Sequence, residues 1–201
     1  MKKITTLVAT AALVLFAAFT EGGYKVGDKA IDFKLKNVND KMVSMADYKD
    51  AKGIIVVFTC NHCPFAKKYE SRIMDLDKKM KAKGFPVVAI NPNDPAIEPE
   101  DSFENMQKRA KEKGYTFPYL IDETQNVAKA YGATKTPHVY VLQKEKDTYI
   151  VKYIGAIDDN SEDESAVKEK YVENAVANIL AGKPVTPDNT KAIGCGIKWK
   201  K

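Results

Sequence analysis

Two cysteines separated by two residues, Cys60 and Cys63, form the arrangement in this 201-residue chain that is best suited to chemistry. A thiolate attacks a disulfide, and a second thiol close by can then displace the product, so a Cys-x-x-Cys pair is typical of thiol–disulfide exchange. A cross-link between residues so close in sequence removes little entropy from the unfolded chain. The pair therefore predicts a reactive dithiol rather than a structural disulfide.

The neighbouring residues place this pair where a strand changes into a helix. The apolar run at 54–58 predicts a buried strand. After the pair, apolar residues at spacings of three and four predict one face of a helix: Phe65, Tyr69, Ile73, Leu76 and Met80. A helix N-terminus stabilises a thiolate through its free N–H groups and dipole. We expect Cys60 to be the exposed nucleophile and Cys63, about one turn deeper, the resolving cysteine.

His62 lies between the two cysteines. A partly charged imidazole would stabilise the Cys60 thiolate and make the pair more oxidising, whereas a solvent-facing His62 would have little influence. Metal binding is the main rival interpretation, because zinc takes three or four ligands, and the set would be Cys60, Cys63, His62 and Cys195. The sequence has no second Cys-x-x-Cys and no His pair. We therefore expect no metal and no cofactor.

The first residues are typical of an export signal. Met1, Lys2 and Lys3 form a positive head, and 4–19 is apolar apart from three threonines. This apolar core is short for a membrane span. We expect a signal peptide at 1–20, cleaved between about 18 and 23, and a mature protein in the periplasm. Secretion, or anchoring to the membrane by an uncleaved signal, is the alternative.

Composition excludes some partner classes. The chain is 44% hydrophobic and 29% charged, as soluble globular proteins are. Its formal net charge is +5, and loss of Lys2 and Lys3 would leave +3. Basic residues are interleaved with acidic ones, so we expect no nucleic-acid partner. Contact with a membrane is expected only through an uncleaved signal.

The remaining pattern predicts an α/β domain. We expect a hairpin near 31–45, a strand at 86–90, a helix capped at 101–102, a short helix that ends at Gly132, and a second hairpin at 139–154. A last helix is expected from about 164 to 181. The order predicts a thioredoxin-like three-layer fold, a central mixed sheet flanked by helices, with an extra N-terminal β-hairpin and a C-terminal tail. We assign the domain to 24–183 and the tail to 184–201.

An ordered set of segments supports this prediction, namely 26–33, 60–64, 100–106, 122–133, 136–137, 155–160 and 194–199. With them the chain resembles thioredoxin-fold proteins of the redoxin/AhpC–TSA superfamily, and within it the peroxiredoxin-like proteins with Cys-x-x-Cys. The resemblance implies thiol–disulfide exchange, a cis bond before Pro137, and docking of an extended partner at Thr136 and Pro137. The implied partners are protein disulfide or dithiol clients and an unidentified redox partner.

Some positions depart from these patterns. Ile54 stands where thioredoxins place a buried acid, so proton handling must differ, with Glu70 or Asp158 as candidates. Val57 stands where typical peroxiredoxins have a threonine. Cys195 lies between glycines in the tail and is either an additional redox thiol, such as a second resolving cysteine, or a packed, inert thiol.

We therefore expect an exported thiol–disulfide oxidoreductase that exchanges disulfides with protein clients through Cys60 and Cys63. One alternative is a thiol peroxidase, peroxiredoxin-like, that uses Cys60. Another is a redox-inactive metal- or haem-handling chaperone built on the same fold. Whether the protein reduces or oxidises its clients depends on the reduction potential of the pair, which the sequence does not give.

Overall fold

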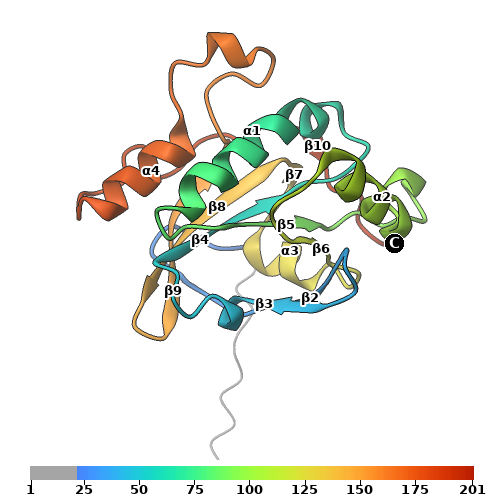
Figure 1. Ribbon diagram of the computed structural model, residues 1–201, viewed down its shortest axis with the longest axis horizontal. Coiled ribbons are helices and arrows are strands. Elements are labelled where there is room, and N and C mark those ends of the chain that lie inside the picture. The colour runs from blue at the N-terminus through green and yellow to red at the C-terminus, as the bar shows by residue number, and fades with distance from the viewer. Residues whose placement is uncertain (1–21) are drawn as a thin grey trace, which may run out of the picture.

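An eight-stranded mixed sheet runs through the middle of the molecule in the order β1-β9-β8-β4-β5-β6-β2-β3 (Figure 1). The computed structural model describes residues 22–201, so the predicted signal peptide lies outside the described residues. β4 pairs in parallel with β5, and β5 with β6, whereas the other neighbours are antiparallel. The strands of this sheet are β1 (Lys29–Ala30), β2 (Lys34–Asn37), β3 (Met42–Ser44), β4 (Gly53–Phe58), β5 (Val87–Asn91), β6 (Tyr119–Ile121), β8 (His138–Glu145) and β9 (Thr148–Gly155).

Helices cover both faces of this sheet. The α-helices are α1 (Pro64–Lys81), α2 (Phe103–Lys113), α3 (Asn126–Tyr131) and α4 (Tyr171–Leu180), and the 3-10 turns are η1 (Met45–Asp47), η2 (Pro99–Asp101) and η3 (Glu164–Ala166). Apolar side chains of α1, α2 and α4 pack in one core cluster, and those of α3 and η1 pack in the other. The predicted α/β fold with three layers is confirmed.

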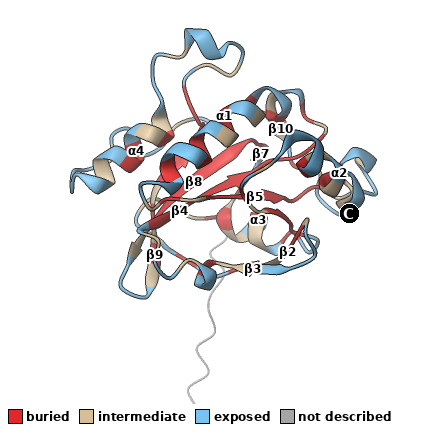
Figure 2. Ribbon diagram, viewed as in Figure 1, coloured by how far each residue is buried: buried red, intermediate tan, exposed pale blue. Residues whose placement is uncertain are grey.

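The central strand β4 is buried on both faces, as predicted (Figure 2). Ile55 and Val57 point into the cluster with α1, whereas Ile54, Val56 and Phe58 point into the cluster with α3. Alternation along the strand explains how one apolar run serves two cores. Within residues 22–201, no helix has the length and apolar character needed to cross a membrane.

The predicted N-terminal hairpin is confirmed as β2 and β3, which pair antiparallel. Asp40 has a φ of 65° in the turn between them, a conformation that Asp tolerates better than most residues. β2 also pairs with β6, so the hairpin extends the sheet at one edge.

The last helix is shorter than predicted. Only η3 and α4 are helical within 164–181, and Val167 has extended backbone angles. The intervening backbone pairs with Asp159 instead, because the carboxylate of Asp159 accepts from Lys168 N–H at 3.0 Å and its own N–H donates to Glu169 O at 3.0 Å. These bonds compete with the helical pattern and delay the start of α4.

The tail returns to the domain. Its strand β10 (Cys195–Gly196) pairs antiparallel with β7 (Lys135–Thr136) in a separate two-stranded sheet. Ile197 is only 7% exposed and packs in the cluster with α3. Lys198 is held through both of its main-chain groups, since its N–H donates to Asn93 Oδ1 at 2.9 Å and its carbonyl accepts from Gln125 Nε2 at 2.8 Å. The boundary between residues 183 and 184 stays a prediction.

Candidate active site

The Cys-x-x-Cys pair lies at the junction of β4 and α1. Cys60 follows the end of β4, and Cys63 is the N-cap residue of α1, with Pro64 as the first helical residue. Proline is accepted there because an N–H at this position has no partner within the helix. The first turn of α1 therefore points its free N–H groups toward the sulfur atoms.

Thr136, distant in sequence, is brought against both cysteines. Its Oγ1 lies 3.2 Å from Cys60 Sγ, and its carbonyl oxygen lies 3.2 Å from Cys63 Sγ. The side chain of Thr136 is fully buried, and the Thr136–Pro137 peptide is cis. The structure thus brings together Cys60, Cys63, Thr136 and Pro137, as the sequence led us to expect.

The cysteines are less accessible than expected. Cys60 is 5% exposed rather than open to solvent, and Cys63 is 0% exposed. The reason is local crowding, because Thr136 Oγ1 covers one side of Cys60 and His62 Nδ1 approaches its sulfur at 3.5 Å. Cys60 remains the member of the pair that a substrate can reach.

The acidic thiol of the reduced pair is Cys63, whereas we expected the more stable thiolate on Cys60. A hydrogen bond from Cys60 lowers the pKa of Cys63 to about 4, and N–H groups of Ala66 and Cys195 lower it further. The same bond, burial and the nearby Asp101 carboxylate raise the pKa of Cys60 well above its usual value. The two opposite shifts share one cause, the hydrogen bond that joins the two sulfur atoms, so the thiols titrate as a pair.

His62 is held by a buried carboxylate that the sequence did not reveal. Its Nδ1 donates to Asp101 Oδ2 at 2.6 Å, and its Nε2 lies 3.9 Å from Glu98 Oε2. This places the Nδ1 proton on the side of Asp101. His62 is therefore a fixed group beside Cys60, not a freely rotating surface histidine.

Asp101 is 0% exposed and also accepts hydrogen bonds from main-chain N–H groups of Asn61 and His62, at 2.6 and 3.3 Å, and from Asn93 Nδ2 at 2.7 Å. It was interpreted only as part of a helix cap, and Ser102 is the residue that caps α2. One signal in the sequence could have identified Asp101. A proline-rich loop at 92–99 follows β5, the strand next to β4, and Asp101 lies just after this loop.

Cys195 also lies at this site. The register of β10 places it opposite Thr136, and its N–H donates to Cys63 Sγ at 3.4 Å. The edge of Thr136 that was expected to receive an extended client is therefore paired with the protein's own tail. A client can use this edge only after β10 has left it.

One group of three potential metal ligands occurs within residues 22–201, namely Cys60, His62 and Asp101, whose ligand atoms lie within 4.8 Å of one another. It differs from the predicted rival set, which relied on Cys63 and Cys195. The Asp101 carboxylate already accepts four hydrogen bonds, including one from His62 Nδ1. A metal would have to displace this network, so the geometry does not favour the chaperone alternative.

Neither candidate for proton handling belongs to the site. Glu70 is bound by Arg109 and by the hydroxyl of Tyr115. Asp158 accepts two hydrogen bonds from Arg72, at 2.9 and 3.0 Å. The buried acid near the cysteines is Asp101.

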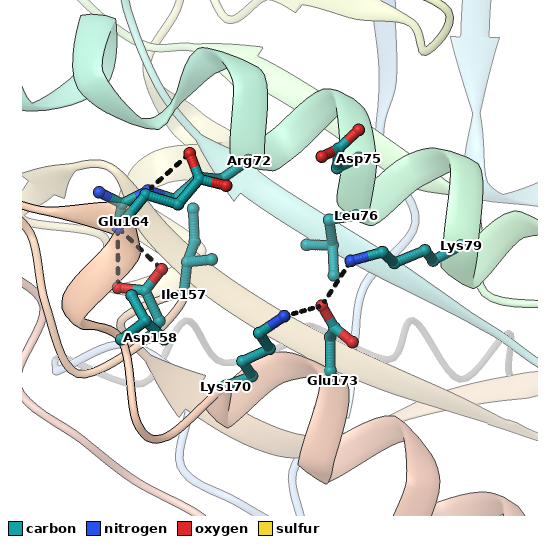
Figure 3. A pocket seen from close by; sticks show the side chains of 10 residues that line it. Arg72, Asp75, Leu76, Lys79, Ile157, Asp158, Glu164, Lys170 and Glu173 are labelled. Atoms are coloured by element: carbon teal, nitrogen blue, oxygen red, sulfur yellow. Dashed lines mark hydrogen bonds and ion pairs between the residues drawn. The ribbon is translucent and has the colours of Figure 1, made fainter.

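Asp158 and Arg72 instead line a cavity of about 250 Å³ between α1 and the segment that carries η3 and α4 (Figure 3). In the same cavity Glu173 binds both Lys79 and Lys170, at 3.3 and 3.8 Å. No cysteine lines it. Except for Asp75, its charged side chains are paired with one another, which is consistent with a structural role.

His138 is buried at the start of β8, where a structural role was expected. Its Nδ1 accepts from Thr134 N–H at 3.4 Å, and burial lowers its pKa to about 4. The imidazole is therefore neutral at physiological pH and serves as a hydrogen-bond acceptor.

Comparison with known proteins identifies the family of the chain. Residues 26–159 match the AhpC/TSA family. The thiol-disulfide oxidoreductase ResA of Geobacillus kaustophilus is 30% identical in an alignment of 159 positions, which covers 72% of this chain and 85% of the relative. A protein of the same name from Halalkalibacterium halodurans is 23% identical, and there the match spans 64% of the relative.

Solved structures share the fold. An uncharacterized conserved protein from Geobacillus kaustophilus is 40% identical, with a TM-score of 0.81, and the match covers 88% of this chain and 93% of the other. The peroxidoxin BcpB of Mycobacterium tuberculosis is 18% identical, with a TM-score of 0.57, over 78% of this chain and 97% of the other. At that identity the likeness shows the fold alone.

Proposed function

The chain is a thioredoxin-fold oxidoreductase of the AhpC/TSA family, and we propose that it exchanges disulfides with protein clients through Cys60 and Cys63. The observation that carries this proposal is the contact of both sulfur atoms with Thr136, at 3.2 Å each, at the N-terminus of α1. Two thiols fixed by one residue need little rearrangement to join or separate.

In the reducing direction, the Cys60 sulfur attacks a client disulfide, its proton passes to the Cys63 thiolate, and one client thiolate leaves. The departing client thiolate takes up that proton from Cys63. The Cys63 thiolate then attacks Cys60 Sγ in the mixed disulfide, which releases the second client thiolate and forms the Cys60–Cys63 disulfide. The oxidising direction is the same sequence reversed. Burial of Cys63 prevents it from reacting with clients directly.

His62 and Asp101 tune this exchange. An imidazole 3.5 Å from Cys60 Sγ stabilises negative charge there when it is protonated, whereas the Asp101 carboxylate raises the pKa of Cys60. Clients dock along Thr136 and Pro137 once β10 has left that edge, where the free main-chain groups would pair with an extended segment.

A trapping experiment tests the proposal. Cys63→Ser should accumulate a mixed disulfide with an oxidised client peptide, because it lacks the thiol that displaces the client from Cys60. Cys60→Ser should form none. Mass spectrometry of the non-reduced mixture distinguishes these results. Equal trapping by both variants, or by neither, would contradict the assignment of roles.

Thiol peroxidase activity is the second candidate, and the 5% exposure of Cys60 favours it, because a small oxidant reaches a narrow opening more easily than a protein does. Cys60 would then form a sulfenic acid, which Cys63 would convert to the disulfide with loss of water. Mixing the reduced protein with hydrogen peroxide and, separately, with the client peptide ranks the two. Rapid reaction with the peroxide alone would favour the peroxidase.

We further propose that the protein is exported to the periplasm, with the segment at 1–20 removed. The support is the positive head followed by a short apolar core. N-terminal sequencing of the protein from a cell envelope extract tests this. A terminus between about residues 18 and 23 is expected, and an intact Met1 would indicate an uncleaved anchor or no export.

A further inference from the structure

The tail brings a third thiol to the Cys60–Cys63 pair. Cys195 stands opposite Thr136 in the register of β10 and β7, and its N–H lies 3.4 Å from Cys63 Sγ. Cys195 also packs against the apolar cluster of Cys60, Cys63 and Ala66. Cys63 thus has two thiol neighbours, Cys60 in its own segment and Cys195 in the tail.

This placement is built into the tail. A Cβ atom on Gly194 would lie 2.2 Å from the carbonyl oxygen of Thr136, so only glycine permits this approach of the two backbones. On the other side of Cys195, a Cβ atom on Gly196 would meet nothing within 4 Å. Ile197 and Lys198 then fix the strand to the domain.

We propose that Cys195 is a third redox residue, which takes over the disulfide from Cys60 after a client has left; this inference rests on the proposed function. The Cys195 thiolate attacks Cys63 Sγ. A Cys63–Cys195 bond forms, the Cys60–Cys63 bond breaks, and Cys60 leaves as a thiolate that takes up the proton Cys195 lost. No external oxidant or reductant is needed, and Cys60 is free for another client.

The electrostatics of the site change in favour of this step once the pair is oxidised. In the reduced protein, burial, the hydrogen bond that Cys195 donates to Cys63 and the charge of the Cys63 thiolate raise the pKa of Cys195 to about 11. The last two causes disappear when Cys63 is in a disulfide. Lys198 and Lys135 still lower the pKa of Cys195.

Thiol mapping tests the inference. The chain has three cysteines, so one disulfide within a molecule leaves one free thiol. The protein is equilibrated with reduced and oxidised glutathione, quenched with acid, alkylated and mapped by mass spectrometry. We expect Cys60 to be the free thiol in about a tenth or more of the oxidised molecules. This fraction corresponds to a Cys63–Cys195 disulfide that is at most about tenfold less stable than Cys60–Cys63.

Free thiol found only on Cys195 at every glutathione ratio would overturn the inference and leave the proposed function intact, since Cys60–Cys63 would then be the sole disulfide. Failure of the proposed function looks different, because no Cys60–Cys63 disulfide would form and no client would be trapped. The thiol map and the trapping experiment together therefore distinguish the two failures.

Matched variants separate a built-in relay from an accidental disulfide. Gly194→Ala should reduce the Cys63–Cys195 fraction at least about fivefold by moving β10 away from Thr136, whereas Gly196→Ala should preserve it. In Cys60→Ser, the two remaining cysteines should join within one molecule. The inference would be overturned if both glycine variants gave equal Cys63–Cys195 fractions. It would also be overturned if Cys60→Ser stayed reduced or formed disulfides only between molecules.

Discussion

His62 Nδ1 lies 2.6 Å from Asp101 Oδ2, although 39 positions separate the two residues in the sequence. The carboxylate is completely buried and comes from η2, at the end of the proline-rich loop, rather than from the strand that precedes the cysteines. This protein therefore supplies the acid near its reactive pair from a loop.

Asp101→Asn should make Cys60 more reactive. The carboxylate raises the pKa of Cys60, so its removal should lower that pKa and speed alkylation at neutral pH by about three- to tenfold. The rate is best measured with iodoacetamide in a Cys63→Ser background, with the modified residue identified by mass spectrometry.

The matched control for that experiment is Glu98→Gln. Glu98 is partly exposed and lies 3.9 Å from His62 Nε2, so solvent screens its effect on Cys60. Its rate should change by less than about twofold. Unchanged or slower alkylation in Asp101→Asn would contradict the conclusion that this carboxylate raises the pKa of Cys60.

The reduction potential of the Cys60–Cys63 pair should fall by about 30 mV per pH unit between about pH 5 and 8, not by about 59 mV. The pKa of Cys63 is lowered to about 4 while that of Cys60 is raised, so reduction by two electrons takes up one proton in this range. Equilibration with glutathione at several pH values gives the slope. A slope near 59 mV would mean that both thiols are protonated.

His138 should destabilise the protein in acid. The pKa of His138 in the folded protein is about 4, below the usual 6.5. Its contribution to the free energy of unfolding is therefore fully present above pH 6.5 and is lost as the pH falls toward 4. The loss corresponds to about 3 kcal/mol. Urea unfolding of wild type and His138→Asn should show a difference in unfolding free energy that narrows by about this amount from pH 7 to pH 4. A constant difference would contradict a buried neutral histidine.

Asp158→Ala should destabilise the fold by about 3–5 kcal/mol, because it leaves the buried Arg72 guanidinium without its buried carboxylate partner. The folded variant should keep the wild-type rate of exchange with a client peptide, since Asp158 lines a cavity without cysteines. Glu164→Gln is the control, because Glu164 is exposed and its loss should cost less than about 1 kcal/mol. If fully folded Asp158→Ala exchanged disulfides more slowly than the wild type, Asp158 would again be a candidate for proton handling.

Local patterns determined much of the fold. The run at 54–58 and the apolar spacing after Cys63 predicted β4 and α1, and with them the position of the dithiol at a helix N-terminus, because side-chain period and helix polarity are local properties. The last helix was predicted too long, because residues 168 and 169 form hydrogen bonds with Asp159 instead of helical ones. The spacing of apolar residues gives no sign of this contact.

The amino-acid sequence by itself determined that the protein carries a reactive thiol pair between a buried strand and a helix. Only the tertiary structure decided which acid lies beside the pair, which thiol is acidic, and that the tail covers Thr136 with Cys195. Those features depend on contacts such as that of Cys195 with Cys63, 132 positions apart. Burial and charge at such contacts come from the packing of distant segments, and the spacing of residues along the chain does not encode them.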